Sequence, residues 1–182
     1  EDFIDDDGIT DELITIHATV TKEDDRLDVD FEGTSRQCKG AIQPVFATSK
    51  AVVYGVMKCV LGAMGVNIPN TGGYFRPVTI SAPEGTFINP LLPAPVAARA
   101  LGLYRASQAV YGAFAQMVPD KVMACTGGCD LGVGLAGYDK SKTPWKAWVQ
   151  LEFANEQGVG GFSNRDGLDA QTMGGTQNMS NI

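Results

Sequence analysis

The residues best suited to chemistry lie in one short run, in which two carboxylates, Asp30 and Glu32, precede Gly33 and the hydroxyl of Thr34. A carboxylate can act as a general base or hold a metal-bound water, and a hydroxyl can position a substrate. Apolar and acidic residues alternate from Leu27 to Glu32, which is typical of a strand with one buried face. Glycine lets the chain turn sharply, so we predict a strand that ends beside the candidate catalytic residues Asp30, Glu32 and Thr34.

The same alternation has a second explanation, because a strand whose outer face meets solvent or another protein shows this pattern as well. The only histidine, His17, lies in another alternating stretch, from Ile14 to Thr21. A lone histidine on a strand is most often a polar residue of the outer face. No nucleophile-elbow sequence supports a serine–histidine–aspartate triad built on it.

A cation further along the chain could bind an anionic group. Arg76 is one of few basic residues in its region. Its guanidinium could hold a carboxylate or phosphate through two hydrogen bonds. A structural ion pair with Glu32 or Glu84 is an equally good interpretation.

A glycine-rich polar stretch, residues 160–167, contains Asn164, Arg165 and Asp166. Successive N–H groups of such a loop can surround an anion, with Arg165 adding charge and Asp166 serving as a further catalytic candidate. A plain surface loop has a similar composition. The Asn-, Thr- and Gln-rich tail up to Asn181 favours a site.

Three other motifs fail when their mechanism is considered. Residues 132–137 match G-x-G-x-x-G, but a turn follows where a dinucleotide site needs a helix, so we predict glycines in closely packed strands. The Cys125–Cys129 spacing lacks two further ligands for zinc and is read as buried small cysteines. Residues 5–8 are acidic, but placing Gly8 in a calcium loop puts Phe3 and Ile14 at ligand positions, so a solvated turn is expected.

The composition of the chain limits the classes of protein to which it can belong. The chain has 182 residues, 44% hydrophobic and 19% charged, with a formal net charge of -7. This length suits one domain, and the negative charge argues against nucleic-acid binding. We see no apolar run of membrane-spanning length, no signal peptide and no disulfide framework among four irregularly spaced cysteines, so a cytoplasmic protein without a membrane partner is expected.

Periodicity predicts an α+β fold of antiparallel hairpins packed with two main amphipathic helices. If Val20 lies opposite Leu27 in the first hairpin, His17 lies opposite Asp30. The chain has no internal repeat, and we treat residues 1–182 as a single domain or as a central segment of a longer polypeptide. The expected elements are strands at 14–21, 27–32 and 78–80, helices at about 46–64 and 97–118, a proline-stiffened segment around 90–95, and a hairpin joining 131–137 to 145–153.

Several stretches, taken in order, resemble the hydantoinase B/oxoprolinase family. They cover nearly the whole chain, and the ordered set is specific although each piece alone is weak. The matching pieces are Asp30–Ser35 with Gln37 and Gly40–Ile42, Pro69–Gly72 with Arg76–Pro77, Ala82–Thr86 with Asn89–Pro90, Pro93–Val96, and Arg165–Gly167.

The resemblance implies part of a large subunit that works in a hetero-oligomer with a hydantoinase A-like, ATP-binding subunit. That partner would activate a carbonyl of the small-molecule substrate with ATP and Mg²⁺. The large subunit would then open a hydantoin, 5-oxoproline or lactam ring. In the related acetone and acetophenone carboxylases, a similar subunit instead joins an activated enol to carbon dioxide or bicarbonate. The family's metal-linked Asp and His motifs lie before the segment present here, so any divalent metal is expected in the missing part and no metal ligand is assigned to this chain.

The sequence departs from the family pattern near its end. Family members often carry a stretch like H-T-H-M-T-N-T-x-N-T, whereas here both asparagines, Asn178 and Asn181, align without the histidines. Gln43 also stands where many members have Asn. These departures raise the carboxylase-like alternative.

Two hypotheses follow. In the first, Asp30, Glu32 and Thr34 position the activated substrate or a metal-bound water. Asn70, Arg76, Asn164, Arg165, Asn178 and Asn181 then bind the substrate. In the second, the segment is mainly a scaffold and subunit interface, with its helices and proline-rich arm against the partner.

Overall fold

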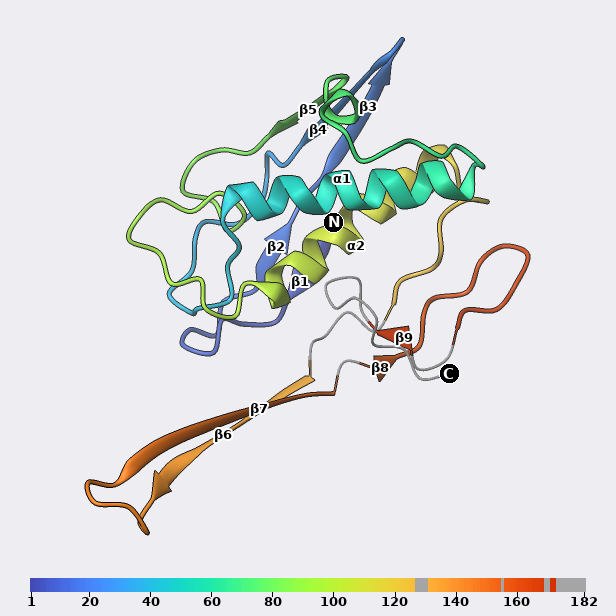
Figure 1. Ribbon diagram of the computed structural model, residues 1–182. Coiled ribbons are helices and arrows are strands. Elements are labelled where there is room, and N and C mark those ends of the chain that lie inside the picture. The colour runs from blue at the N-terminus through green and yellow to red at the C-terminus, as the bar shows by residue number, and fades with distance from the viewer. Residues whose placement is uncertain (127–130, 155, 169–170, 173–182) are drawn as a thin grey trace.

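The computed structural model describes residues 1–126, 131–154, 156–168 and 171–172, with side chains described for 1–126, 134–150 and 158–168. Two helices and several small antiparallel or mixed sheets confirm the α+β class (Figure 1). The elements are β1 (Asp2–Ile4), β2 (Ile14–Ile16), β3 (Thr19–Glu23), β4 (Arg26–Asp30), α1 (Phe46–Ala63), the 3-10 helix η1 (Gly72–Phe75), β5 (Val78–Ser81), α2 (Ala100–Met117), β6 (Leu131–Asp139), β7 (Lys146–Ala154), β8 (Glu156–Gln157) and β9 (Gln171–Thr172).

The central sheet has the order β3-β4-β5 and is not built of antiparallel hairpins alone. β5 pairs with β4 in parallel, with Leu27 opposite Val78 and Asp30 opposite Ser81. Parallel neighbours need a long crossover, which α1 and η1 supply here. The prediction of antiparallel pairing was therefore incomplete, because strand periodicity does not reveal the direction of the partner.

The first hairpin differs from its predicted register. The stretch 14–21 breaks at His17–Ala18 into two strands: β2 pairs with β1, and β3 pairs with β4. Val20 lies opposite Val29 rather than Leu27, and Thr19 rather than His17 lies opposite Asp30. The tight turn sets the register of β3 and β4, because Asp24 adopts a positive φ of 47° and lets the strands close at the Glu23–Arg26 pair.

Both predicted helices form. α1 ends at Ala63, where Gly65 has a φ of +82° and the Val66 N–H reaches the Leu61 carbonyl at 2.9 Å, a typical C-terminal helix cap. By length and composition alone α1 could cross a membrane, with a mean hydropathy of 1.2. One of its faces packs in the core instead, which accounts for the apolar residues; those buried are Ser49, Val53, Val56, Met57 and Val60.

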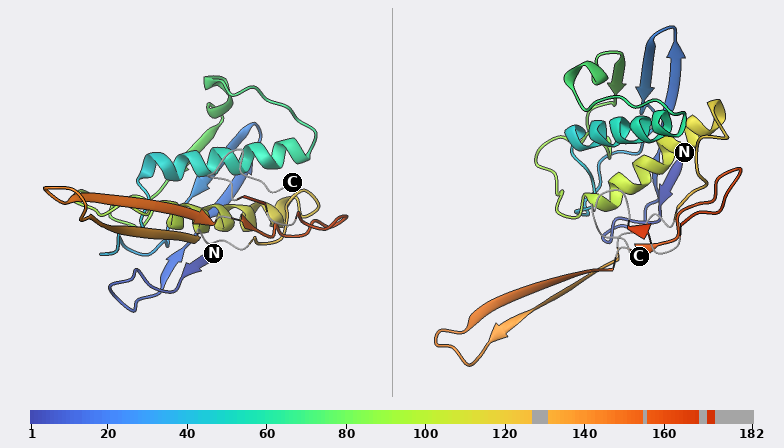
Figure 2. Two further views of the ribbon diagram at one scale, coloured as in Figure 1. Left: turned by 60° about the horizontal axis from the view of Figure 1, so that its bottom comes forward. Right: turned by 45° about the vertical axis from the view of Figure 1, so that its right-hand side comes forward.

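The core lies where α1 and α2 cross each other beside the β1–β2 and β3-β4-β5 sheets (Figures 1 and 2). The predicted inward face of the 27–32 stretch is confirmed at Val29 in β4 and at Phe31 just after it, which are 1% and 0% exposed, while Leu27 is half-buried. Phe87 and Ile88, between β5 and α2, are fully buried with them. Gly102 of α2 lies so close to Phe87 that a Cβ there would sit 2.8 Å from its ring, so this glycine sets how near α2 comes.

β6 and β7 form a long two-stranded arm that projects from the body (Figures 1 and 2). The predicted hairpin is thus confirmed, and it extends to Asp139 and Lys146. Residues 132–137 lie in the middle of β6 rather than at the start of a helix. The prediction that these glycines lie in a strand is therefore confirmed.

Asp7 is 5% exposed, whereas a solvated turn was expected here. Its carboxylate accepts hydrogen bonds from the N–H groups of Ile9 and Thr10 in its own turn, at 2.9 and 2.6 Å. It also accepts from the N–H groups of Lys39 and Gly40, at 2.9 and 2.8 Å. These bonds to the charged form, led by those from Thr10 and Gly40, hold the pKa of Asp7 well below its usual range.

We expect Asp7→Asn to lower the melting temperature at neutral pH, because an amide cannot supply the same charged acceptor to four N–H groups. Asp6→Asn is the matched control, since Asp6 is exposed and its carboxylate accepts, among the described residues, only the Gly8 N–H. A depressed folded-state pKa stabilises above the unfolded pKa of about 3.9. The difference in melting temperature between wild type and Asp7→Asn should therefore be constant above about pH 5 and shrink as the pH falls below about 4. Equal melting curves for the two variants would contradict this role.

Candidate functional site

Beyond β4 the chain forms a corner, residues 30–35, that is held by side-chain hydroxyls. Gly33 has a φ of +90° and turns the chain toward β2. The Thr34 hydroxyl accepts the His17 N–H at 3.1 Å and donates to the His17 carbonyl at 3.2 Å. Ser35 accepts the Thr15 N–H through its hydroxyl, and its own N–H binds the Thr15 carbonyl, both at 2.9 Å. These hydroxyls supply hydrogen-bond partners for the backbone of Thr15 and His17, where β2 ends.

His17 lies over this corner rather than opposite Asp30. Its Nδ1 is 2.8 Å from the Glu32 carbonyl oxygen, and its ring packs 3.5 Å from where a Cβ of Gly33 would be. A carbonyl oxygen can only accept, so Nδ1 carries the proton and the Nε2 of the neutral ring is left as an acceptor. Nε2 is 3.8 Å from a Glu1 carboxylate oxygen, and the His17 side chain is 34% exposed. His17 therefore keeps one partly exposed ring nitrogen, which faces Glu1.

The two candidate carboxylates of the corner differ in their contacts. Asp30 accepts the Ser81 hydroxyl at 2.7 Å and the Glu32 N–H at 3.3 Å, so it is tied to the sheet. The Glu32 residue is exposed, and within the described part of the chain its carboxylate has no hydrogen bond or ion pair. Glu32 is therefore the carboxylate that is free to meet a ligand, whereas Asp30 and Thr34 hold the corner.

Arg76 lies away from this corner. It lies two residues before the start of β5, where the Leu27 N–H binds the Pro77 carbonyl at 2.9 Å. Asp30 and Ser81 lie at the other end of both strands. Leu27 and Asp30 are three residue steps apart along β4, so at about 3.3 Å per residue these ends are separated by roughly 10 Å. Within the described residues Arg76 pairs with neither Glu32 nor Glu84. The corner and Arg76 therefore lie at opposite ends of the β4–β5 pair.

The remaining candidates lie on other loops. Asn70 accepts a hydrogen bond from the Lys58 ammonium of α1. Asn164, Arg165 and Asp166 are exposed, and the Arg165 guanidinium lies 4.3 Å from the Phe162 ring centre. Their loop is bonded to the strand-free segment after α2, where the Ala124 N–H meets the Gly161 carbonyl at 2.9 Å. Asn178 and Asn181 lie outside the described residues.

The structure corrects the expectation that Cys125 is a buried cysteine. Cys59 and Cys125 are exposed and Cys38 is half-buried, where burial raises its pKa; Cys129 lies outside the described residues. All three described thiols are free. In the part of the chain that the structure describes, no three His, Cys, Asp or Glu side chains come close enough to hold a metal ion.

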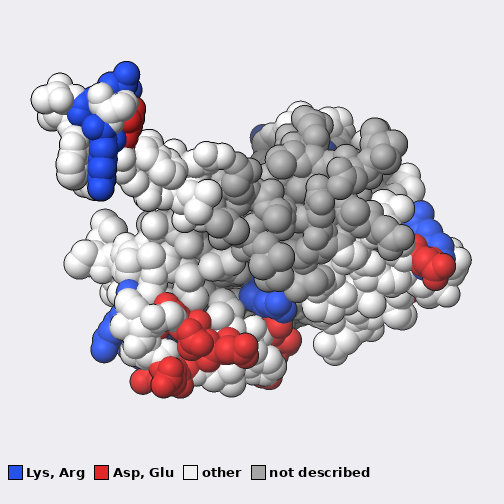
Figure 3. All heavy atoms as spheres, turned by 90° about the horizontal axis from the view of Figure 1, so that it is seen from below, with Lys and Arg blue, Asp and Glu red and all other residues white. Residues whose placement is uncertain are grey.

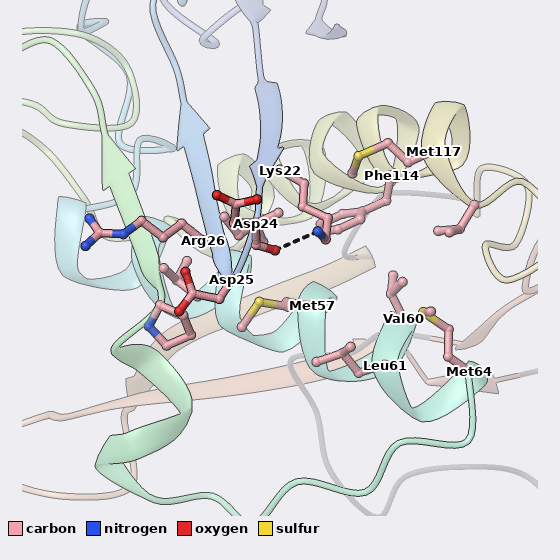
Figure 4. Close-up of a pocket in the computed structure, with 14 residues that line it drawn as sticks. Lys22, Asp24, Asp25, Arg26, Met57, Val60, Leu61, Met64, Phe114 and Met117 are labelled. Carbon is pink, nitrogen blue, oxygen red and sulfur yellow. Dashed lines mark hydrogen bonds between the residues drawn. The ribbon is translucent and has the colours of Figure 1, made fainter.

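A hollow opens at the far end of the sheet, between the β3–β4 turn and the ends of α1 and α2 (Figure 4). It has a volume of about 300 Å³, and its wall is apolar, with Met57, Met64 and Met117 among the lining residues. The charged residues at its rim are Lys22, Asp24, Asp25 and Arg26, and the Lys22 ammonium donates to the Asp24 backbone carbonyl at 2.7 Å. This groove suits an apolar group and lacks the polar donors that would orient a ring amide.

Comparison with known proteins identifies the relatives of this arrangement. A model of the hydantoinase B/oxoprolinase family matches residues 1–182. The chain belongs to this family. A protein assigned as the B-type subunit of a D-/L-hydantoinase from Pseudomonas sp. (strain NS671) is 31% identical over 172 residues, which are 92% of this chain and 28% of that protein. 5-Oxoprolinase 1 of Arabidopsis thaliana is 32% identical over 131 residues, 71% of this chain and 9% of that protein.

Two solved structures resemble the fold. The ATP-dependent caprolactamase from Pseudomonas jessenii has a TM-score of 0.68 at 25% identity, covering 87% of this chain and 27% of that one. Acetone carboxylase in its nucleotide-free form has a TM-score of 0.67 at 19% identity, covering 88% and 21%. The chain thus spans about a quarter of the length of most of these relatives.

Some of the stretches that carry the family resemblance meet in space around a connector, residues 33–43, namely Asp30–Ser35, Gly40–Ile42, Ala82–Thr86 and Pro93–Val96. Two glutamines join it to the proline-rich segment. Gln37 exchanges hydrogen bonds with the backbone of Leu91, at 2.7 and 3.3 Å. Gln43 is fully buried and binds the Cys38 N–H and carbonyl as well as the Pro95 carbonyl, at 3.1, 2.9 and 3.1 Å. These stretches therefore build one framework beside the corner, whereas Arg76 and residues 165–167 lie on other parts of the chain.

We expect Thr34→Val to destabilise the protein by about 1–3 kcal/mol, because it leaves the His17 N–H and carbonyl without their hydroxyl partner. Thr34→Ser keeps the hydroxyl and should retain most of the stability. Urea unfolding monitored by circular dichroism measures both. If Thr34→Val matched wild type while Thr34→Ser did not, the hydroxyl would not be what holds the corner.

Proposed function

We propose that the chain is part of the large subunit of an ATP-dependent cyclic-amide hydrolase, which acts with a hydantoinase A-like ATP-binding subunit. Support comes from the family match over the whole chain, the 31% identity to a B-type hydantoinase subunit and the likeness to caprolactamase. An amide carbonyl is a poor electrophile, which explains why ring opening would be coupled to ATP. In this proposal the partner activates the ring carbonyl with ATP and Mg²⁺ in a cytoplasmic hetero-oligomer.

The observation that carries a role for this segment is the exposed Glu32 carboxylate, which has no hydrogen bond or ion pair among the described residues and stands on the corner where the Glu32 carbonyl accepts the His17 Nδ1–H. Attack of water on an activated carbonyl needs a group that takes up its proton. Glu32 would serve as that base or position the substrate, and His17 would assist through Nε2. Asp30 and Thr34 would act as positioning residues, because their side chains are tied to Ser81 and to the His17 backbone.

The test uses the full-length protein with its ATP-binding partner, assayed for ATP-dependent opening of hydantoin, 5-oxoproline and caprolactam. Glu32→Gln should lower kcat/KM by about 100-fold or more, the usual effect of removing a general base. Asp28→Asn is the matched control, because Asp28 lies within β4, further from the corner than Asp30. It should leave kcat/KM nearly unchanged.

Equal activity of the two variants would exclude Glu32 from the chemistry. If Glu32→Gln instead weakened binding of the partner subunit at unchanged kcat, the scaffold hypothesis would replace the catalytic one. A complex that opens no ring but consumes a ketone with bicarbonate would be a carboxylase.

Because Arg76 lies away from the corner, its role can be tested by a second measurement. If Arg76 and the exposed loop bind substrate within the assembled enzyme, Arg76→Ala and Asp166→Ala should raise KM with little change in melting temperature. Unchanged kinetics with weaker assembly would assign both residues to the subunit interface.

A further inference from the structure

The corner after β4 contains a type II turn, residues 31–34. The Phe31 carbonyl accepts the Thr34 N–H at 3.2 Å, and Gly33, the third residue of the turn, has a φ of +90°. Among the described non-glycine residues only Asp24 has a positive φ, so Glu32 does not. This combination is typical of a type II turn, whose central peptide is rotated by about 180° from its orientation in a type I turn. The orientation of the Glu32–Gly33 peptide therefore distinguishes the two forms of this corner.

His17 holds this peptide in its type II orientation. The Nδ1–H of the ring donates to the Glu32 carbonyl at 2.8 Å, and the ring packs against Gly33. The backbone of His17 is itself fixed to the turn, because the Thr34 hydroxyl bonds both its N–H and its carbonyl, at 3.1 and 3.2 Å. Nδ1 donates both in this neutral tautomer and in the protonated ring. Rotation of the peptide would break the bond to Nδ1.

The Gly33 N–H has no hydrogen bond among the described residues. The other N–H groups of this stretch are bonded within the chain; they belong to Phe31, Glu32, Thr34 and Ser35. The Glu32–Gly33 peptide is trans, and the carbonyl and N–H of a trans peptide point in opposite directions. Because the carbonyl points to the His17 ring, the Gly33 N–H points away from it.

The orientation of this peptide decides what the corner offers to a ligand. In the type II form it offers an N–H on the side away from His17, whereas a rotated peptide would offer a carbonyl oxygen there. A carbonyl group activated with ATP carries anionic oxygen, which a fixed donor stabilises and an acceptor repels. The formal net charge of the chain is -7, and Figure 3 shows Asp and Glu side chains gathered in one patch of the surface. In so acidic a chain, an anionic oxygen depends on donors directed at it.

We propose that His17 is a positioning residue, whose Nδ1–H holds the Glu32–Gly33 peptide so that the Gly33 N–H donates to an anionic oxygen of the activated substrate. This role rests on the proposed function, which places the substrate at the corner beside the Glu32 carboxylate. It is separate from any part that Nε2 plays, because Nε2 lies on the other side of the ring and faces Glu1.

Two substitutions of His17 separate Nδ1 from the rest of the ring, in the full-length protein with its ATP-binding partner. The amide nitrogen of Asn can replace Nδ1 as a donor, whereas that of Gln reaches the place of Nε2, and neither can act as a base. The kcat for ring opening should be at least about tenfold higher in His17→Asn than in His17→Gln, at similar KM. Both variants keep the backbone groups that Thr34 binds, so their melting temperatures should be similar.

Gly33→Ala disturbs the same peptide through another atom. Alanine rarely adopts a φ of +90°, while its Cβ would meet the His17 ring at an ordinary contact distance of 3.5 Å. If both substitutions act by rotating this peptide, adding His17→Gln to Gly33→Ala should lower kcat by less than about twofold further. Effects that multiply in the double variant would contradict a shared peptide.

Amide hydrogen exchange, measured by mass spectrometry on the same full-length proteins, reports on the turn without any ring-opening activity. The peptide that contains residues 31–35 should exchange about three- to tenfold faster in His17→Gln than in wild type, which corresponds to one lost hydrogen bond. His17→Asn should exchange like wild type.

Equal exchange in the two His17 variants would overturn the role of Nδ1. Equal kcat of the two variants, in an enzyme that Glu32→Gln impairs, would overturn it as well. A fully active Glu32→Gln enzyme would instead overturn the proposed function, and the exchange rates would still decide whether His17 holds the turn.

Discussion

The structure depends on how the connector, residues 33–43, satisfies its backbone. This segment belongs to no helix or longer strand, yet it passes between β2, β4, the segment after β5 and α1. A buried backbone group without a partner costs free energy comparable to a lost hydrogen bond. Side chains supply the partners: hydroxyls of Thr34 and Ser35 toward β2, the Asp7 carboxylate toward Gly40, and Gln43 toward Cys38.

Close packing adds to this constraint. A Cβ on Gly40 would lie 1.9 Å from the Asp7 carbonyl oxygen, so only glycine lets the two segments meet. The Phe87 N–H binds the Ser35 carbonyl at 2.8 Å, and the Ser49 hydroxyl binds the Ile88 carbonyl at 2.7 Å. The connector thereby fixes the buried Phe87–Ile88 pair against α1 and the core.

Within this framework, the candidate site residues fall into two groups. Asp30 and Thr34 serve the framework, so their side chains are not free for a substrate. Glu32 and His17 stand on the same corner with exposed groups, held in place by a backbone that cannot shift easily. Catalytic groups need such support, because small misplacements cost activity.

The sequence by itself determined the periodic parts. The helical spacing of apolar residues in α1 and α2, the buried face of Val29 and Phe31 and the β6–β7 hairpin follow from local pattern, and the ordered motifs were enough to assign the family. The tertiary structure alone decided the break at His17, the parallel β4–β5 pair, the burial of Asp7 and the distance between Arg76 and the Gly33 corner. These depend on contacts between residues far apart in the chain, such as Thr34 with His17 and Asp7 with Gly40. Periodicity reports which face of an element is buried, but not which element covers it.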